Sequence, residues 1–294
     1  MRLLGLVVKS YSNMYDVQVG DEILTCRVRG KFKKRSTTVM GGDQVRVTLT
    51  EPGRGVIEEV LPRKSVLTRP PVANVDQAVV VFSCRRPAVS LRMLDRLLVC
   101  VEEAGLDVIL CLNKVDLASG EEVEGLRRTY AGVGYPFLCC NARAGTGIDA
   151  LRAQLEGRIS VLAGESGVGK STLINRLVRG ANLPTGEVSG RAERGRHTTR
   201  NVELLRLAPS GYVVDTPGFS YLELNMIEPG ELAYYFPEMR DLSAECRFDD
   251  CLHQQEPDCA VKAVVQGGQI ARSRYESYLS FLEEIQEYVR NRYR

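Results

Sequence analysis

The stretch from Gly164 to Thr172, GESGVGKST, carries the residues with the clearest chemistry in this sequence. It matches the pattern G-x-x-x-x-G-K-[ST] without a gap, in which glycines let backbone N–H groups turn inward around phosphate oxygens. The lysine of such a loop reaches the β- and γ-phosphates, and the hydroxyl that follows it can ligate Mg²⁺. The pattern therefore predicts a nucleoside triphosphate site formed by Gly164, Glu165, Ser166, Gly167, Val168, Gly169, Lys170, Ser171 and Thr172.

The flanks of this loop supply the elements that must position it. An apolar run at 159–163 predicts a strand before the loop, and residues 171–178 have the spacing of a helix after it. The helix would add its positive N-terminal end to the phosphate cradle. A plain glycine-rich turn is the alternative, which this strand, loop and helix context disfavours.

A second motif follows another predicted strand, at 106–112. Its residues, NKVD, are Asn113, Lys114, Val115 and Asp116, and ligands bind α/β sheets at such strand ends. A carboxylate there can accept hydrogen bonds from both N1–H and the exocyclic amine of guanine. Adenine lacks that amine, so the site favours GTP over ATP. Asn141 and Ala142 resemble the small base-side motif usually written Ser-Ala. Asn141 departs from that motif, because serine is more usual at this position.

Two further elements complete a GTPase set. Asp215 to Gly218, DTPG, follow a predicted strand; Asp215 can reach Mg²⁺ through water, and the Gly218 backbone can meet the γ-phosphate. The segment GRHTTRN offers Thr198 or Thr199 for the Mg²⁺ shell, and we assign Ser171, Thr199 and Asp215 to that ion. GTPases usually place these motifs before NKxD, whereas here NKVD comes first. A circular permutation explains this order, with new ends between DTPG and NKVD.

The remaining segments predict a multidomain α/β protein. Alternating short runs at 1–68 indicate a five-stranded β-barrel of the oligonucleotide-binding (OB) type that binds RNA. Residues 69–222 predict a circularly permuted P-loop GTPase domain with a parallel sheet, and 62–71, PRKSVLTRPP, a linker into it. Residues 223–294 predict a mainly α-helical zinc-binding domain that ends in a basic tail. The cluster assigned to RNA is Arg29, Lys31, Phe32, Lys33, Lys34 and Arg35, and a solvated hairpin is the equal alternative.

The cysteines and the net charge indicate the cellular compartment and the kinds of partner and metal site to expect. The chain has 294 residues, nine cysteines, a net charge of +2 and no export signal, which favours a reducing cytoplasm over a disulfide framework. Because the net charge is small, any nucleic-acid contact must come from local clusters. Three thiols and one imidazole gather in a polar stretch, as Cys246, Cys251, His253 and Cys259. These ligands predict one structural Zn²⁺ ion in a closed tetrahedral site.

The motifs in this order resemble one family, the circularly permuted GTPases typified by ribosome small-subunit-dependent GTPase A. The resemblance rests on RGKFKK, NKVD, GESGVGKST, GRHTTR, DTPGF and CRFDDCLHQQEPDCAV, and it covers essentially the whole chain. It implies a cytoplasmic enzyme that binds GTP and GDP and acts in late maturation of the small ribosomal subunit. The expected partners are that subunit and its rRNA, with no membrane or DNA partner and a monomeric chain.

The expected hydrolysis is slow without the particle. Phe219 stands where many GTPases place the glutamine that orients the attacking water. His197 resembles the histidine held responsible in the family, with a purely structural switch role as the alternative, and Lys170 and Thr199 complete the catalytic assignment. A competing function is a GTP-gated RNA- or protein-binding switch in which hydrolysis only resets affinity.

Overall fold

The computed structural model describes residues 2–11, 13–29, 38–68, 70–185, 202–219 and 223–292, and for 215–219 it describes the backbone alone. These residues fall into two compact units. Unit 1 comprises Met1–Ala78, Ile148–Leu162 and Lys170–Phe219, and unit 2 comprises Val79–Gly147, Ala163–Gly169 and Ser220–Arg294.

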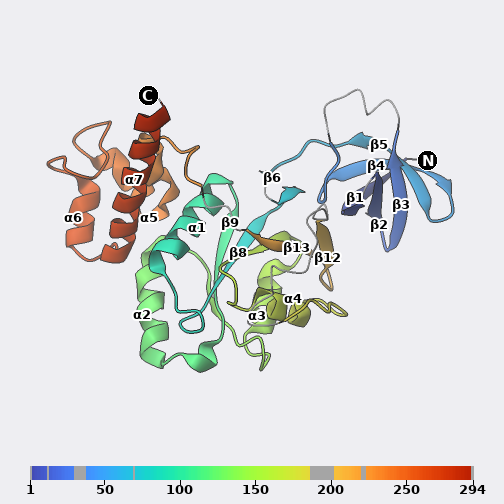
Figure 1. Ribbon diagram of the computed structural model, residues 1–294, viewed down its shortest axis with the longest axis horizontal. Coiled ribbons are helices and arrows are strands. Elements are labelled where there is room, and N and C mark those ends of the chain that lie inside the picture. The colour runs from blue at the N-terminus through green and yellow to red at the C-terminus, as the bar shows by residue number, and fades with distance from the viewer. Residues whose placement is uncertain are drawn as a thin grey trace. The chain divides into compact units, whose positions relative to one another are not determined.

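Unit 1 begins with a closed β-barrel (blue in Figure 1). Its strands are β1 (Arg2–Tyr11), β2 (Met14–Val19), β3 (Glu22–Val28), β4 (Gln44–Glu51) and β5 (Arg54–Val60). The order β1-β2-β3-β5-β4 closes because β4 also pairs with β1, while β3 and β5 run parallel. Alternate residues of these strands point inward, so the barrel core gathers Val7, Val17, Leu24, Cys26, Val45, Val47 and Ile57, and Val39, which precedes β4, packs with them. The expected OB-type barrel is confirmed.

The segment expected to be a linker forms a small hairpin instead. Strand β6 (Val66–Thr68) pairs antiparallel with β7 (Pro71–Ala73). Leu67 and Val72 face each other and are both buried, which is the apolar contact that the proline-rich composition concealed. Pro71 is tolerated because it opens its strand, where a missing N–H disturbs the ladder least.

The rest of unit 1 carries the α/β elements that surround the phosphate loop in sequence. They are α3 (Ile148–Leu155), β11 (Ile159–Ala163), α4 (Lys170–Leu177), β12 (Glu203–Arg206) and β13 (Tyr212–Phe219). The expected parallel sheet does not extend to β12, which runs antiparallel to β13. Strand β12 also pairs with β1 of the barrel, where the Lys9 ammonium lies 2.8 Å from a carboxylate oxygen of Glu203.

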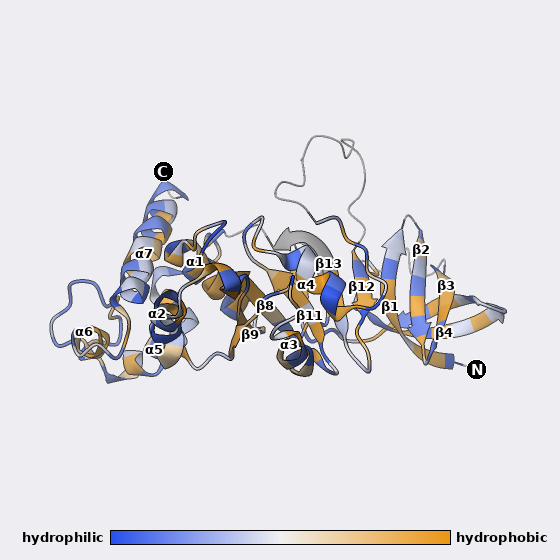
Figure 2. Cartoon of the chain, turned by 90° about the horizontal axis from the view of Figure 1, so that it is seen from below, coloured by the Kyte–Doolittle hydropathy of each residue, from blue (hydrophilic) through white to orange (hydrophobic). Residues whose placement is uncertain are grey.

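Unit 2 contains three strands in the order β10-β9-β8, namely β10 (Phe137–Cys139), β9 (Asp107–Leu112) and β8 (Gln77–Phe82). Figure 2 shows β8 and β9 as apolar along their length, and every residue of β8 is buried. Strands β10 and β9 are parallel, as expected. Helix α1 (Leu91–Glu103) starts where the Ser90 hydroxyl accepts a hydrogen bond from the Met93 N–H, and α2 (Gly120–Tyr130) starts at a capping box formed by Ser119 and Glu122.

The C-terminal part of unit 2 is helical, as expected (orange to red in Figure 1). It comprises the 3₁₀ helices η4 (Pro229–Tyr235) and η5 (Leu242–Glu245) and the α-helices α5 (Pro237–Arg240), α6 (Ala260–Gln266) and α7 (Arg272–Arg292). The short helices η2 (Val115–Leu117) and η3 (Ala131–Val133) lie earlier in this unit. Helix α7 continues through Arg292, so most of the expected basic tail is helical. Among the described residues, no helix combines the length and apolar character needed to cross a bilayer.

Candidate nucleotide and metal sites

The phosphate loop is held by glycines at its two ends. Gly164 follows β11 with φ of 143°, and Gly169 precedes α4 with φ of 102°. A Cβ on Gly164 would collide with the Val81 carbonyl, and one on Gly169 would collide with the Asn113 side-chain amide. Both positions therefore need glycine for space as well as for backbone angle. After this loop, Lys170, Ser171 and Thr172 form the first turn of α4 and are partly exposed.

Asn113 joins the phosphate loop to the base motif within unit 2. Its Nδ2 donates to the Val168 carbonyl oxygen at 2.9 Å, and its Oδ1 accepts from the Ala142 N–H at 3.1 Å. The side chain is 1% exposed, and Val168 and Ala142 are buried as well. One amide thus uses both of its ends to fix two loops, which orients them without help from solvent.

Lys114 makes a second connection between the same two motifs. Its backbone is left-handed with φ of 60°, and its ammonium donates to the Gly167 carbonyl at 2.7 Å and to the Arg86 carbonyl at 2.5 Å. Val115 and Asp116 follow on η2, and the Asp116 side chain is exposed. The carboxylate expected to select guanine is therefore accessible beside the loop expected to hold the phosphates.

Asn141 has a local role as well as its predicted base contact. Its Oδ1 accepts hydrogen bonds from the Arg143 and Ala144 N–H groups, each at 3.1 Å, and so closes a tight turn. Through the Ala142 N–H this turn is attached to Asn113. The phosphate loop, the NKVD motif and the turn at Asn141 follow β11, β9 and β10, and these hydrogen bonds join all three at strand ends, where α/β sheets bind ligands.

Several predicted site residues lie outside the described part of the chain. These are Lys31, Phe32, Lys33, Lys34, Arg35, His197 and Thr199. Arg29 is described, and its exposed guanidinium lies 2.5 Å from a carboxylate oxygen of Glu58. Asp215 and Gly218, expected to follow a strand, lie within β13, where Asp215 pairs with Glu203 across the ladder.

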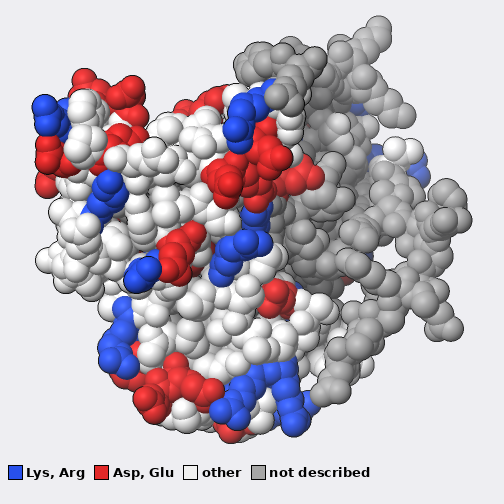
Figure 3. Space-filling view, turned by 60° about the vertical axis from the view of Figure 1, so that its left-hand side comes forward, with Lys and Arg blue, Asp and Glu red and all other residues white. Residues whose placement is uncertain are grey.

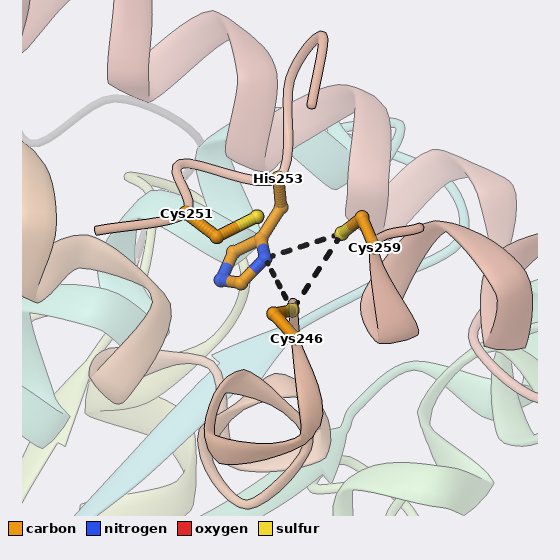
Figure 4. A group of neighbouring side chains, drawn as sticks. All are labelled: Cys246, Cys251, His253 and Cys259. Atoms are coloured by element: carbon orange, nitrogen blue, oxygen red, sulfur yellow. Dashed lines mark hydrogen bonds between the residues drawn. The ribbon is translucent and has the colours of Figure 1, made fainter. Parts of the chain in front are cut away.

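The four predicted metal ligands come together in one cluster (Figure 4). The potential ligand atoms of Cys246, Cys251, His253 and Cys259 all lie within 4.8 Å of one another. The His253 Nδ1 atom is 3.5 Å from the Cys246 sulfur and 3.4 Å from the Cys259 sulfur. Three sulfurs and one imidazole nitrogen are the donor set of closed structural zinc sites, so the residues present fit that ion.

Burial shifts the pKa of two of these ligands, with opposite consequences for metal binding. Burial lowers the pKa of His253, which keeps its imidazole neutral and able to coordinate. By contrast, burial raises the pKa of the Cys251 thiol to about 12, which favours the protonated thiol. A bound divalent ion would reverse that effect, because thiols deprotonate when they coordinate one.

A buried charge network lies next to this region, and sequence patterns did not indicate it. The Arg274 guanidinium on α7 is 2.8 Å from Asp95 Oδ1 on α1 and 2.7 Å from Glu238 Oε1 on α5. The Tyr130 hydroxyl donates to the same Asp95 oxygen at 2.8 Å. Burial by itself lowers the pKa of Arg274, but Glu238 and Asp95 outweigh it and raise that pKa. The network attaches the C-terminal helices to the helices that flank the base motif.

Comparison with known proteins identifies relatives across nearly the whole chain. Residues 60–225 match the model of the RsgA GTPase family, and residues 4–57 match that of the RsgA N-terminal domain. The small ribosomal subunit biogenesis GTPase RsgA of Carboxydothermus hydrogenoformans is 49% identical over 282 residues, covering 96% of this chain and 97% of the relative. The protein of the same name from Moorella thermoacetica is 47% identical over 281 residues, with coverage of 96% and 97%.

Solved structures agree with the sequence relatives. The crystal structure of YjeQ from Thermotoga maritima has a TM-score of 0.86 and 41% identity, and the match covers 97% of this chain and 99% of that one. YloQ, described as a circularly permuted GTPase, has a TM-score of 0.85 and 34% identity, with coverage of 98% and 96%. The permuted motif order, the closed barrel and the joined nucleotide motifs agree with these matches. This chain therefore belongs to the RsgA GTPase family, a family of GTP hydrolases.

Proposed function

We propose that this protein hydrolyses GTP during late maturation of the small ribosomal subunit, and that its nucleotide state controls rRNA binding and release on that particle. The observation that carries this proposal is the pair of side chains, Asn113 and Lys114, that bind the base motif to the phosphate loop. The full-length similarity to small ribosomal subunit biogenesis GTPases supports the choice of particle.

The nucleotide contacts divide between the two joined motifs. Backbone N–H groups of 164–169 and the Lys170 ammonium would hold the phosphates, while Asp116 would accept the N1–H and amine of guanine. Ser171, Thr199 and Asp215 offer hard oxygen donors of the kind that Mg²⁺ prefers. When bound, that ion neutralises charge that develops on the phosphate oxygens.

Catalysis in this proposal depends on a group outside the usual glutamine position. Because Phe219 offers no hydrogen bond to water, we assign the orientation of the attacking water to His197. Lys170 would stabilise the charge on the transferred phosphoryl group, and the Thr199 hydroxyl would complete the Mg²⁺ shell. This division of roles predicts a low intrinsic rate that rises when the particle is present.

The metal cluster has a structural role in the proposed function. Cys246, Cys251, His253 and Cys259 would use all four positions of one Zn²⁺ ion, which leaves none open for water. Binding would stabilise the segment from Cys246 to Cys259, where among the described side chains only His253 and Cys259 are buried.

RNA contact is proposed for the basic segment of the barrel, Arg29 to Arg35. Figure 3 shows acidic and basic side chains interspersed over the described part of one face, with neither sign dominating it. Affinity for rRNA should therefore come from a local cluster such as this one, with salt-dependent binding. We also propose a cytoplasmic monomer that binds neither DNA nor membranes.

The decisive experiment measures hydrolysis of GTP and ATP with and without purified small ribosomal subunits. We expect slow turnover of GTP alone, a large increase with the particle and little activity with ATP. Equal GTP turnover in both conditions would refute the proposal. A second experiment measures release of a His197→Ala variant from the particle. Normal release without hydrolysis would favour the alternative function, a switch in which hydrolysis only resets affinity.

A further inference from the structure

The two ring nitrogens of His253 have different surroundings. Nδ1 faces the sulfurs of Cys246 and Cys259, whereas Nε2 lies 3.1 Å from the Ser243 hydroxyl oxygen. The ring is almost fully buried at 1% exposure, so solvent is not available as an alternative partner for Nε2. Figure 4 shows Nδ1 on the side of the ring that faces these two sulfurs.

The Ser243 hydroxyl has its own acceptor, and that decides where the imidazole proton lies. The Ser243 hydroxyl oxygen lies 3.0 Å from the Met239 carbonyl oxygen. A carbonyl oxygen can only accept, so the Ser243 hydroxyl must donate its proton to Met239. A hydroxyl carries one proton, so towards His253 the Ser243 oxygen must accept. Nε2 therefore carries the imidazole proton, and Nδ1 keeps the lone pair that faces the sulfurs.

Two tyrosines fix the histidine backbone from another side. The Tyr275 hydroxyl donates to the His253 carbonyl at 2.6 Å, and the Tyr278 hydroxyl donates to the Leu252 carbonyl at 2.9 Å. The backbone of His253 has φ of 56°, a conformation that non-glycine residues adopt only when the surroundings hold it. With the backbone fixed in this way, the hydrogen bond to Ser243 sets the remaining rotation of the ring.

We propose that Ser243 is the positioning residue of the metal centre, which holds His253 in the Nε2–H tautomer and so makes Nδ1 the ligand atom. This inference rests on the zinc assignment above and adds a residue outside the Cys₃His set. It also links the centre to the α5 backbone through Met239, next to Glu238, which binds Arg274. Groups that orient a coordinating histidine typically change metal affinity about 10–100-fold when they are removed.

The affinity test uses full-length zinc-loaded protein and competition with a chromogenic chelator. We expect Ser243→Ala to bind zinc about 10–100-fold more weakly than the wild type. Ser243→Thr keeps the hydroxyl and should bind within a few-fold of the wild type. Ser280→Ala is the matched control, because that hydroxyl lies on α7 next to Arg92 and not at the cluster. Wild-type affinity in Ser243→Ala, or equal loss in Ser243→Thr, would overturn the proposal.

The tautomer itself can be measured on the wild type, which avoids any variant that fails to fold. Long-range nitrogen–proton NMR distinguishes the two ring nitrogens, and the chain has only two histidines. We expect the metal-dependent histidine to show a protonated Nε2 and a coordinated Nδ1. A coordinated Nε2 would refute the assignment. Neither measurement needs GTP or ribosomal particles, so failure here is distinguishable from failure of the proposed function.

Discussion

Replacing Asn113 by alanine tests the junction on which the nucleotide site depends. The substitution removes both amide hydrogen bonds, the one donated to the buried Val168 carbonyl and the one accepted from the Ala142 N–H. A buried carbonyl left without its donor costs about 1–3 kcal/mol, and this is the loss of stability that we expect from the Val168 carbonyl. Loss of the restraint on the phosphate loop should also weaken nucleotide binding at least about tenfold, which corresponds to about 1.4 kcal/mol.

The matched control for this variant is Asn141→Ala. Within the part of the chain that the structure describes, the Asn141 amide oxygen accepts from the Arg143 and Ala144 N–H groups in its own turn. Both neighbours are exposed, so water can replace those bonds. We expect this control to lose less than about 1 kcal/mol. Urea unfolding is followed by circular dichroism, because the chain has no tryptophan for fluorescence, and affinity is measured with fluorescent GDP. Equal unfolding midpoints for the two variants would refute the reasoning.

Three further predictions test the C-terminal half of the chain. Arg274→Met leaves the Asp95 and Glu238 carboxylates buried without their cation, which should cost about 3–5 kcal/mol in denaturant titration; a loss no larger than that of Arg272→Met, an exposed arginine, would contradict it. The hydrogen bond from Arg96 lowers the pKa of Glu284, so the wild type should be more stable than Glu284→Gln at neutral pH. This difference in stability should vanish as the pH falls below the unfolded-state pKa of about 4.3 and through the folded-state pKa. A difference that persists at low pH would exclude the ion pair as its cause. Cys259→Ser should reduce bound zinc measured by atomic emission and expose the segment 246–259 to proteolysis, whereas Cys100→Ser, on α1, should keep its zinc; equal zinc contents in the two proteins would contradict the ligand assignment.

The nucleotide motifs could be predicted because their chemistry is local in sequence. The phosphate loop, the NKVD motif and the strands before them are continuous segments, and a strand buried on both faces is recognisable as an apolar run. Their meeting in space follows from a general rule, since ligands bind at the carboxyl ends of strands in α/β sheets. The hydrogen bonds by which the Asn113 side chain joins two loops were not predictable, because its partners are backbone groups of Val168 and Ala142 and not side chains.

Contacts between segments that are distant in sequence could not be predicted from local patterns. Arg274 and Asp95 are 179 positions apart, and neither has a neighbour that marks it as part of a buried ion pair. Ser243 is a single serine in a short helix, and its proposed role depends on two contacts, with His253 and Met239, that no sequence pattern indicates. The hairpin of β6 and β7 was missed for another reason, since prolines at 62, 70 and 71 suggested a linker although Pro71 opens a strand.

The permuted order changes what the segment after Asp215–Gly218 is attached to. Within unit 2, α7 contacts α1 through Arg274 with Asp95 and through Arg96 with Glu284. The chain then runs from α1 into β9, and Asn113 directly follows the end of β9 at Leu112.

The metal cluster and the base motif are therefore parts of one compact unit. We expect a partner that binds the metal-bearing region to act on the base side of the nucleotide site through α1. Rigid attachment predicts that Arg274→Met should change nucleotide affinity, although Arg274 is not among the residues assigned to the nucleotide. If the C-terminal region instead responded only to the segment around Thr199, the same substitution would leave the affinity of the isolated protein for GDP unchanged.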